Sequence, residues 1–237
     1  MVVVSAVSLS GLLILSLNPK WLEKHLHILV SFAAGSLFGD AFIHLLPESF
    51  ARAENPLSVS LLALLGILVF LMVERFIISK HRHGEHEHRG LRPVVFINLI
   101  SDGVHNFIDG LLIGASFLVS PTLGAATFVA VLLHEIPQEI GDFGILVHGG
   151  LSYRKAIAFN LLTAASAILG VVVSLLAGPQ FAGYSEAMLP VTAGGFIYIA
   201  GSNLVPDLIR QARPGTFIPD ILAMAAGVSI MAALAAQ

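Results

Sequence analysis

The sequence predicts an all-α polytopic membrane protein, a bundle of eight transmembrane helices with both termini on the extracytoplasmic side. Only 11% of its 237 residues are charged and 56% are hydrophobic, whereas a soluble domain carries about 25% charged residues. Apolar stretches near the ~20 residues that cross a bilayer recur along the chain, and basic residues gather in alternate connections. A backbone in lipid must satisfy its own hydrogen bonds, so each stretch is expected to be helical.

The apolar stretches follow one another with short connections. They lie at about residues 1–17, 26–46, 57–79, 93–119, 122–148, 155–177, 186–209 and 217–236. Apart from one histidine-rich connection, no low-complexity segment divides them, so we expect a single membrane domain over residues 1–237. The first stretch is interpreted as a span and not as a cleaved signal peptide, because no basic region precedes it.

Basic residues decide the expected orientation. All but one of the 12 lie in the connections after the first, third, fifth and seventh spans or at flanking span ends: Lys20, Lys24, Arg75, Lys80, Arg82, Arg89, Arg92, Arg154, Lys155, Arg210 and Arg213. Only Arg52 lies on the opposite side. Because positive charge is retained in the cytoplasm, these connections are expected to be cytoplasmic and both termini to face outside. The chain has no cysteine, which excludes thiolate metal sites.

The third connection, at about residues 80–92, is rich in histidine. Its four imidazoles are those of His81, His83, His86 and His88. Such tracts bind metal ions, and we expect weak, mobile coordination on the cytoplasmic side. A solvated charged linker is the alternative.

The fourth and fifth spans hold an excess of acidic residues. Between Arg92 and Arg154 there is no lysine or arginine, yet the segment holds five carboxylates: Asp102, Asp109, Glu135, Glu139 and Asp142. Each costs about 2.5–3.5 kcal/mol to insert into a bilayer. Because no basic side chain offsets them, we expect a cation from outside the chain, and the neighbouring histidines favour a transition metal. A polar network that only joins helices rarely needs so many acids without a base.

Helical spacing places these groups on facing surfaces at the middle of the membrane. Residues four apart share one face of a helix, and the pairs are His105 with Asp109, His134 with Gln138, and Glu135 with Glu139. Asp102 lies one turn before His105. The short connection between the two spans makes them antiparallel neighbours. Two such faces supply about four to six nitrogen and oxygen ligands, which suits Zn²⁺, Fe²⁺ or Mn²⁺.

Proline and glycine shape the same two spans. Pro137 cannot donate a backbone hydrogen bond, so it is expected to kink the fifth span, and broken helices at mid-depth are common at transporter ion sites. Small residues allow close helix packing, and Gly110 and Gly114 form a GxxxG pattern. Gly103, Gly141 and Gly144 are expected to act in the same way, mostly as ordinary membrane packing.

An intramembrane metalloprotease is the catalytic alternative. Such enzymes carry His-Glu-x-x-His, with two histidines on zinc and the glutamate as general base. Here Gln138 stands in the place of the second histidine, and Pro137 interrupts the helix that would align the pair. We therefore expect a protein that is not an enzyme.

Two longer motifs surround the central residues. Residues 105–110 read His-Asn-Phe-Ile-Asp-Gly, and residues 134–143 read His-Glu-Ile-Pro-Gln-Glu-Ile-Gly-Asp-Phe. Both resemble motifs of the ZIP (Zrt/Irt-like protein) family of divalent-metal transporters. The resemblance extends to residues 39–48 on the second span, to residues 198–201 on the seventh, to the eight-span plan and to the histidine-rich third connection.

The resemblance implies uptake of metal into the cytosol by an elevator-like movement of the first, fourth, fifth and sixth spans, usually in a homodimer. The main site would use His105, Asp109, His134, Glu135 and the position of Gln138. A second site would use Asn106, Asp109 and Glu135. Stronger ligands stand in relatives at the positions of Gln138, Thr163 and Asn203, so we expect lower affinity or less dependence on two ions.

Candidate pathway residues follow from the expected topology. Asp40, His44 and Glu48 recur every four residues toward the outer end of the second span, where an ion would enter. Asp207 and His148 lie near cytoplasmic ends, where it would leave. The remaining acids of the central spans, Asp102, Glu139 and Asp142, are also assigned to the pathway.

Zn²⁺ is the expected substrate, with Fe²⁺, Mn²⁺ and Cd²⁺ as alternatives, because imidazole remains in the main site. The expected partners are divalent ions, the lipid bilayer and a second copy of the chain, with no nucleic acid. The expected location is a multi-pass position in a prokaryotic plasma (inner) membrane. A passive metal-permeable channel with the same site and no elevator movement remains the other alternative.

Overall fold

The computed structural model describes residues 19–81, 93–210 and 212–235. Every regular element in these ranges is helical, as the all-α prediction requires. The first expected span, residues 1–17, lies outside the described residues. So do three of the four loop histidines, His83, His86 and His88, while His81 closes a helix and its side chain is not described.

The second expected span is one continuous run of helix that is longer than predicted. It consists of α3 (Pro19–Gly39), the π-helical segment η1 (Asp40–Leu45) and α4 (Leu46–Arg52). The elements that follow are α5 (Pro56–His81), α6 (Pro93–Val119), α7 (Pro121–His148), α8 (Tyr153–Ala164), α9 (Ser166–Ala177), η2 (Gly178–Gln180), α10 (Tyr184–Tyr198), η3 (Ile199–Leu204), α11 (Val205–Arg210) and α12 (Phe217–Ala235). These elements match the second to eighth expected spans.

Five of these helical runs are long and apolar enough to cross a membrane. They are His25–Arg52, Pro56–Phe76, Tyr153–Gln180, Tyr184–Arg210 and Phe217–Ala235. The helices that carry the central carboxylates, α6 and α7, are not among them, although they have 27 and 28 residues. A membrane protein built of helices is therefore supported, and the full count of eight spans stays a prediction.

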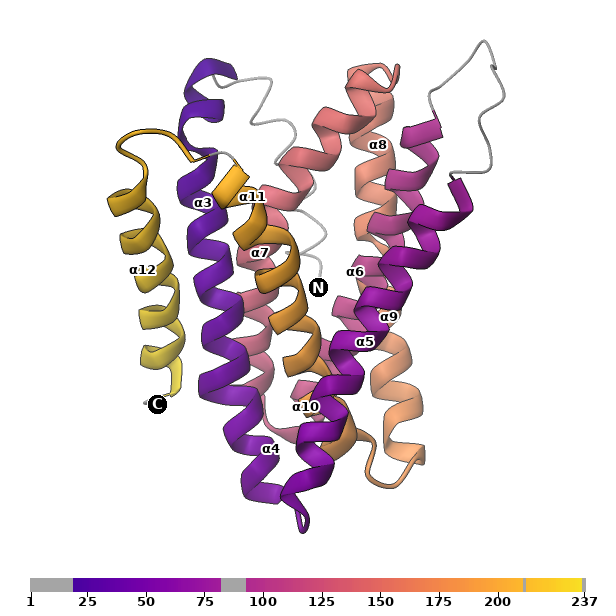
Figure 1. The fold of residues 1–237 in the computed structure, drawn as a ribbon. Helices are drawn as coiled ribbons and strands as arrows, with labels where there is room; N and C mark the ends of the chain where they lie inside the picture. Colours follow the sequence, from indigo (N-terminus) through magenta and orange to yellow (C-terminus); the bar gives the residue numbers. More distant parts are fainter. Residues whose placement is uncertain (1–18, 82–92, 211, 236–237) are drawn as a thin grey trace.

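The long helices stand side by side, and successive connections lie at opposite ends of the bundle (Figure 1). α12 packs on α3, α10 packs on α5, and α6 contacts both α7 and α9. The larger apolar cluster gathers buried side chains of α3, α6, α7 and α10, among them Leu37, Leu112, Val131 and Phe196. A smaller cluster of buried apolar side chains around Phe143 joins α6, α7 and α8 near the connection between α7 and α8.

Two helical runs contain a π-helical segment just before a proline. At the end of η1 the amide of Leu46 donates to the carbonyl oxygen five residues back, and at the end of η3 the amide of Val205 does the same. Pro47 and Pro206 follow directly and have no amide hydrogen to donate. Such wide turns are rare and occur mostly at functional sites.

Close contact between α6 and α9 depends on glycine, as the GxxxG pattern predicted. A Cβ added to Gly110 would lie 2.0 Å from the carbonyl oxygen of Ala167, and one added to Gly170 would lie 2.1 Å from that of Phe107. Gly114 meets the side chain of Ser174 at 2.6 Å in the same way. Helices in lipid gain little from the hydrophobic effect, so this close packing is what holds the pair together.

The same expectation was wrong for two glycines of α7. Within the described ranges, a Cβ added to Gly141 or Gly144 would meet no atom within 4 Å, so close packing among these helices does not require glycine there. At Gly103 of α6 the nearest atom is 3.7 Å away, on Thr163, which is an ordinary contact. Pro137 lies inside α7 without ending it. Figure 1 shows the C-terminal part of α7 leaning away from the axis of its first part, as a proline kink predicts.

Candidate metal site

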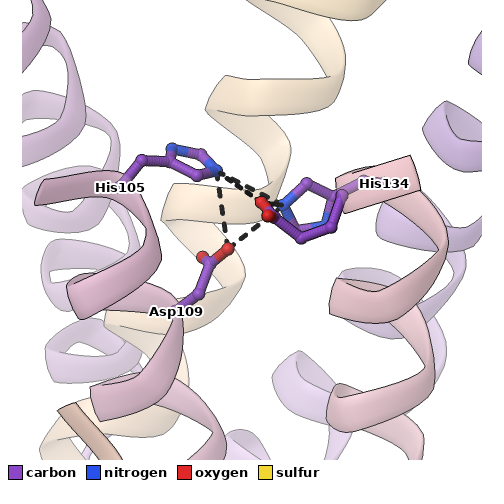
Figure 2. A group of neighbouring side chains, drawn as sticks. His105, Asp109 and His134 are labelled. Carbon is purple, nitrogen blue, oxygen red and sulfur yellow. Dashed lines mark hydrogen bonds and ion pairs between the residues drawn. The ribbon is translucent and has the colours of Figure 1, made fainter. Parts of the chain in front are cut away.

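Four of the predicted ligands meet between α6 and α7. His105 and Asp109 lie on α6, His134 and Glu135 lie on α7, and one ligand atom from each lies within 4.8 Å of all the others. Figure 2 shows the two imidazoles pointing toward each other from the two helices, with the Asp109 carboxylate beside them. The sequence spacing thus predicted this cluster correctly.

Five of the six separations between the ligand atoms are close to those expected in a tetrahedral zinc site. Nε2 of His134 lies 3.2 Å from Oδ2 of Asp109 and 3.5 Å from Oε1 of Glu135. Nε2 of His105 lies 3.5 Å from Oδ2 of Asp109, 3.7 Å from Oε1 of Glu135 and 3.3 Å from Nε2 of His134. Ligands at about 2.0–2.1 Å from zinc in a tetrahedron stand about 3.3 Å apart. The four atoms can therefore bind one ion with little movement.

The site lacks other partners for its carboxylates. Both oxygens of Asp109 and Oε1 of Glu135 are buried and have no hydrogen-bond donor in the part of the chain that the structure describes. A buried carboxylate without a partner is costly, and a divalent cation would supply the missing charge. Nδ1 of His134 lies 3.2 Å from the carbonyl oxygen of Ala130, which directs Nε2 toward the site.

Local structure brings the two helices together in this register. Val119 ends α6 and Pro121 begins α7, so the connection is a single residue, Ser120, whose hydroxyl accepts a hydrogen bond from the amide of Leu123. Side chains of the two helices also join directly, because Thr127 donates to Ser116 over 3.2 Å. Antiparallel helices with so short a connection place residues equally far from it at the same depth.

A cavity of about 490 Å³ begins at this site. It is lined by residues from α3, α5, α6, α7, η3 and α11, which include Leu26, Asp102, His105, Gln138, Asp142, Asn203 and Asp207. Of the four clustered residues only His105 lines it, and its side chain is 16% exposed, against 1% for the other three. The cavity therefore joins the site to the end of the bundle where α11 lies.

Gln138 lies in this cavity and interacts with the carboxylate of Asp102. Its role as a metal ligand stays a prediction, because the structure gives it another polar neighbour. Thr163 of α8 donates to Oδ2 of Asp102, and Asn106 donates to Oδ1 over 2.8 Å. Asn106, a residue of the expected second site, and Thr163, where relatives have a stronger ligand, therefore both meet Asp102, although the amide oxygen of Asn106 is buried without a donor among the described residues.

Sequence reasoning missed the amides that meet the other acids. Asn160 of α8 is fully buried and donates to Oε2 of Glu139 over 2.8 Å, and Asn98 interacts with Asp142. The signal was available, because asparagine inside an apolar span is as unusual as an acid. A second missed group is Glu74 of α5, which lines the cavity and accepts a hydrogen bond of 2.8 Å from the hydroxyl of Tyr198.

The expected entrance residues fall into two groups. Asp40 and His44 are buried, with Nδ1 of His44 3.0 Å from Oδ1 of Asp40. Glu48 is exposed and pairs with Arg52. Because η1 is π-helical, the α-helical register used to place all three on one face is wrong.

The expected exit residues lie at the opposite end. Asp207 lines the cavity and pairs with Arg210. His148 closes α7, and its side chain is not described. Asp102 and Asp142 also line the cavity, whereas Glu139 faces Asn160 of α8.

Comparison with known proteins identifies the family to which the chain belongs. The family model described as "ZIP Zinc transporter" matches residues 1–92 and 78–235. The chain is 35% identical over 298 residues to the zinc transporter SLC39A7 of Homo sapiens, covering 89% of this chain and 64% of the relative. It is 36% identical over 221 residues to the zinc transporter ZIP13 of Pongo abelii, covering 87% and 66%.

A third relative is the zinc transporter zipt-7.1 of Caenorhabditis briggsae, 34% identical over 274 residues, with 87% of this chain and 70% of the relative covered. The chain thus spans about two thirds of the length of the curated relatives it matches. All three relatives come from animals, which gives the expected prokaryotic plasma membrane no support. Their names describe transporters and not enzymes. The chain belongs to the ZIP zinc transporter family.

Proposed function

We propose that this protein carries divalent transition-metal ions, zinc above all, across a membrane through the site between α6 and α7. The observation that carries the proposal is the set of four ligand atoms at tetrahedral spacing, two imidazole nitrogens and two carboxylate oxygens. Mixed nitrogen and oxygen ligands also bind Fe²⁺, Mn²⁺ and Cd²⁺, so this ligand set alone does not select zinc. The relatives named as zinc transporters support zinc as the first choice.

Transport fits this site better than hydrolysis. A catalytic zinc usually keeps one position open for water beside three protein ligands. Here four protein groups stand ready to surround the ion, and Gln138 lies toward Asp102. A closed site in mid-helix suits an ion that is bound, carried and released.

The direction of transport is proposed to be into the cytosol. The cavity opens at the end of the bundle that holds Arg210 and the connection between α7 and α8, where the basic residues gather. By the positive-inside rule this is the cytoplasmic side. The ion would enter past Asp40 and His44 and leave past Asp102, Asp142 and Asp207.

Three more detailed proposals follow from the resemblance to ZIP proteins. Movement of the helices that hold the site would expose it to each side in turn, as in an elevator. The protein would work as a homodimer in the bilayer. A second ion, if bound, would use the amide oxygen of Asn106 together with Asp109 and Glu135, and it would bind weakly because Thr163 offers no carboxylate there.

The site is tested by removing its ligands. We expect His105→Ala and Glu135→Ala to abolish nearly all zinc flux into proteoliposomes loaded with a fluorescent zinc indicator, while both variants still elute as folded protein. Glu186→Ala, on the exposed first turn of α10, is the matched control and should transport as the wild type does. Full activity in either site variant would remove the assignment.

A further inference from the structure

An ion bound in the metal site can leave toward the cavity on the side where His105 lies. Asp109, His134 and Glu135 are almost fully buried, and none of them lines the cavity. An ion that moves from the site into the cavity must therefore pass the imidazole of His105. After His105, the ion would first meet a side chain that lines the cavity beside this imidazole.

Helix α5 supplies that neighbour. The ring of Phe70 packs edge-on against His105, with ring centroids 6.3 Å apart. Glu74 follows Phe70 by four residues, so it lies on the same face of α5. It lines the same cavity as His105. This acid lies on α5, which contributes no residue to the cluster of four ligands between α6 and α7.

Tyr198 of α10 holds the carboxylate in place. Its hydroxyl donates to Oε2 of Glu74 over 2.8 Å, and its ring lies 6.5 Å from that of Phe70. Within the described ranges no hydrogen bond or ion pair involves Oε1 of Glu74, and the nearest basic residue in the chain, Arg75, has an exposed side chain. One oxygen is thus anchored, and the other remains available to a cation.

We propose that Glu74 is a further metal-binding residue, which receives the ion released past His105 and passes it into the cavity. The chemistry is that of a transient carboxylate ligand for a divalent cation, with no bond made or broken within the protein. The proposal rests on the proposed function, because it needs an ion to leave the site between α6 and α7. It adds a contribution from α5 to a pathway otherwise built on α6, α7 and α11.

Glu74→Gln tests the charge without changing the shape. The amide oxygen still accepts the hydrogen bond from Tyr198, so the brace between α5 and α10 remains. We expect the maximal rate of zinc flux to fall by about tenfold or more, the usual effect of losing a group beside metal ligands. Zinc affinity of the main site, measured by calorimetry on the purified protein, should stay unchanged. Glu186→Gln is the matched control.

Two further variants separate a ligand from a brace. Glu74→His restores a metal ligand and should recover much of the lost rate, whereas Tyr198→Phe keeps the carboxylate and should have the milder effect. A normal rate in Glu74→Gln overturns the proposal, as does a slow Tyr198→Phe combined with no recovery in Glu74→His. His105→Ala tests the proposed function separately. If this variant keeps zinc binding and zinc flux, the proposed function itself fails, whatever result the Glu74 variants give.

Discussion

The two π-helical segments have related sequences and opposite surroundings. Each places a polar residue three positions before a proline and an acid directly after it: His44, Pro47 and Glu48 in the first, Asn203, Pro206 and Asp207 in the second. They lie toward opposite ends of the bundle (Figure 1). Around η1 the polar groups are buried in the larger apolar cluster, whereas η3 and α11 line the open cavity.

This difference shows that one end of the site is closed and the other is open. At the closed end Asp40 is fully buried, and the ring of His44 and the hydroxyl of Thr127 stand against its carboxylate. At the open end Asp207 is half-exposed and pairs with Arg210. The same local pattern of helix, wide turn and proline thus lies in a buried setting at one end and lines the cavity at the other.

The largest expected effect is a difference in accessibility. The chain has no cysteine, so single cysteines can be introduced without background. We expect Asn203→Cys to react with a hydrophilic thiol reagent about tenfold or more faster than His44→Cys, because reaction requires exposure of the thiolate. Mass spectrometry of the purified protein measures the rates. Equal rates would mean that the outer end is not closed.

Charge removal should also affect the two ends unequally. Asp40→Asn removes a buried acid that stands beside His44 on the proposed path, and we expect zinc flux to fall at least several-fold. Asp207→Asn removes an exposed ion pair worth about 0.2–1 kcal/mol, and flux should change little. Flux assays in proteoliposomes, with protein amounts matched, decide the matter. A larger loss in Asp207→Asn would reverse the assignment of the two ends.

A smaller effect is expected from a substitution on the side of the metal site that faces the cavity. Gln138→His replaces a weak amide with an imidazole at the cavity edge, and we expect zinc to bind roughly tenfold more tightly, or about 1.4 kcal/mol. Calorimetry measures the affinity, and a peptidase assay should show no hydrolysis. Unchanged affinity would indicate that Gln138 stays with Asp102 and does not reach the ion.

The smallest expected effect belongs to the histidine-rich connection between α5 and α6. Deleting residues 81–88 should leave zinc flux largely intact and change mainly its dependence on metal concentration, since this tract lies outside the proposed path. The control is a deletion variant in which an equally long glycine–serine segment restores the length of the connection. Complete loss of flux in both variants would make the tract an obligatory relay.

Sequence reasoning worked best where the signal was local and repeated. Apolar length predicted seven of the helical runs that the structure describes, because a chain in lipid can satisfy its backbone only within a helix. Spacing of four residues and a one-residue connection predicted that His105, Asp109, His134 and Glu135 would meet. It failed at Glu48, because a π-helical turn shifts every later side chain around the helix axis.

By itself, the sequence determined that the chain is a helical membrane protein and which two helices carry the candidate metal ligands, because apolar length and ligand spacing are properties of single helices and of one short turn. Only the tertiary structure decided which side of the site is open, that Asn160 and Thr163 meet the remaining acids, and that Glu74 lines the same cavity as His105. These contacts join side chains of different helices. They depend on how the helices pack, which no local pattern specifies.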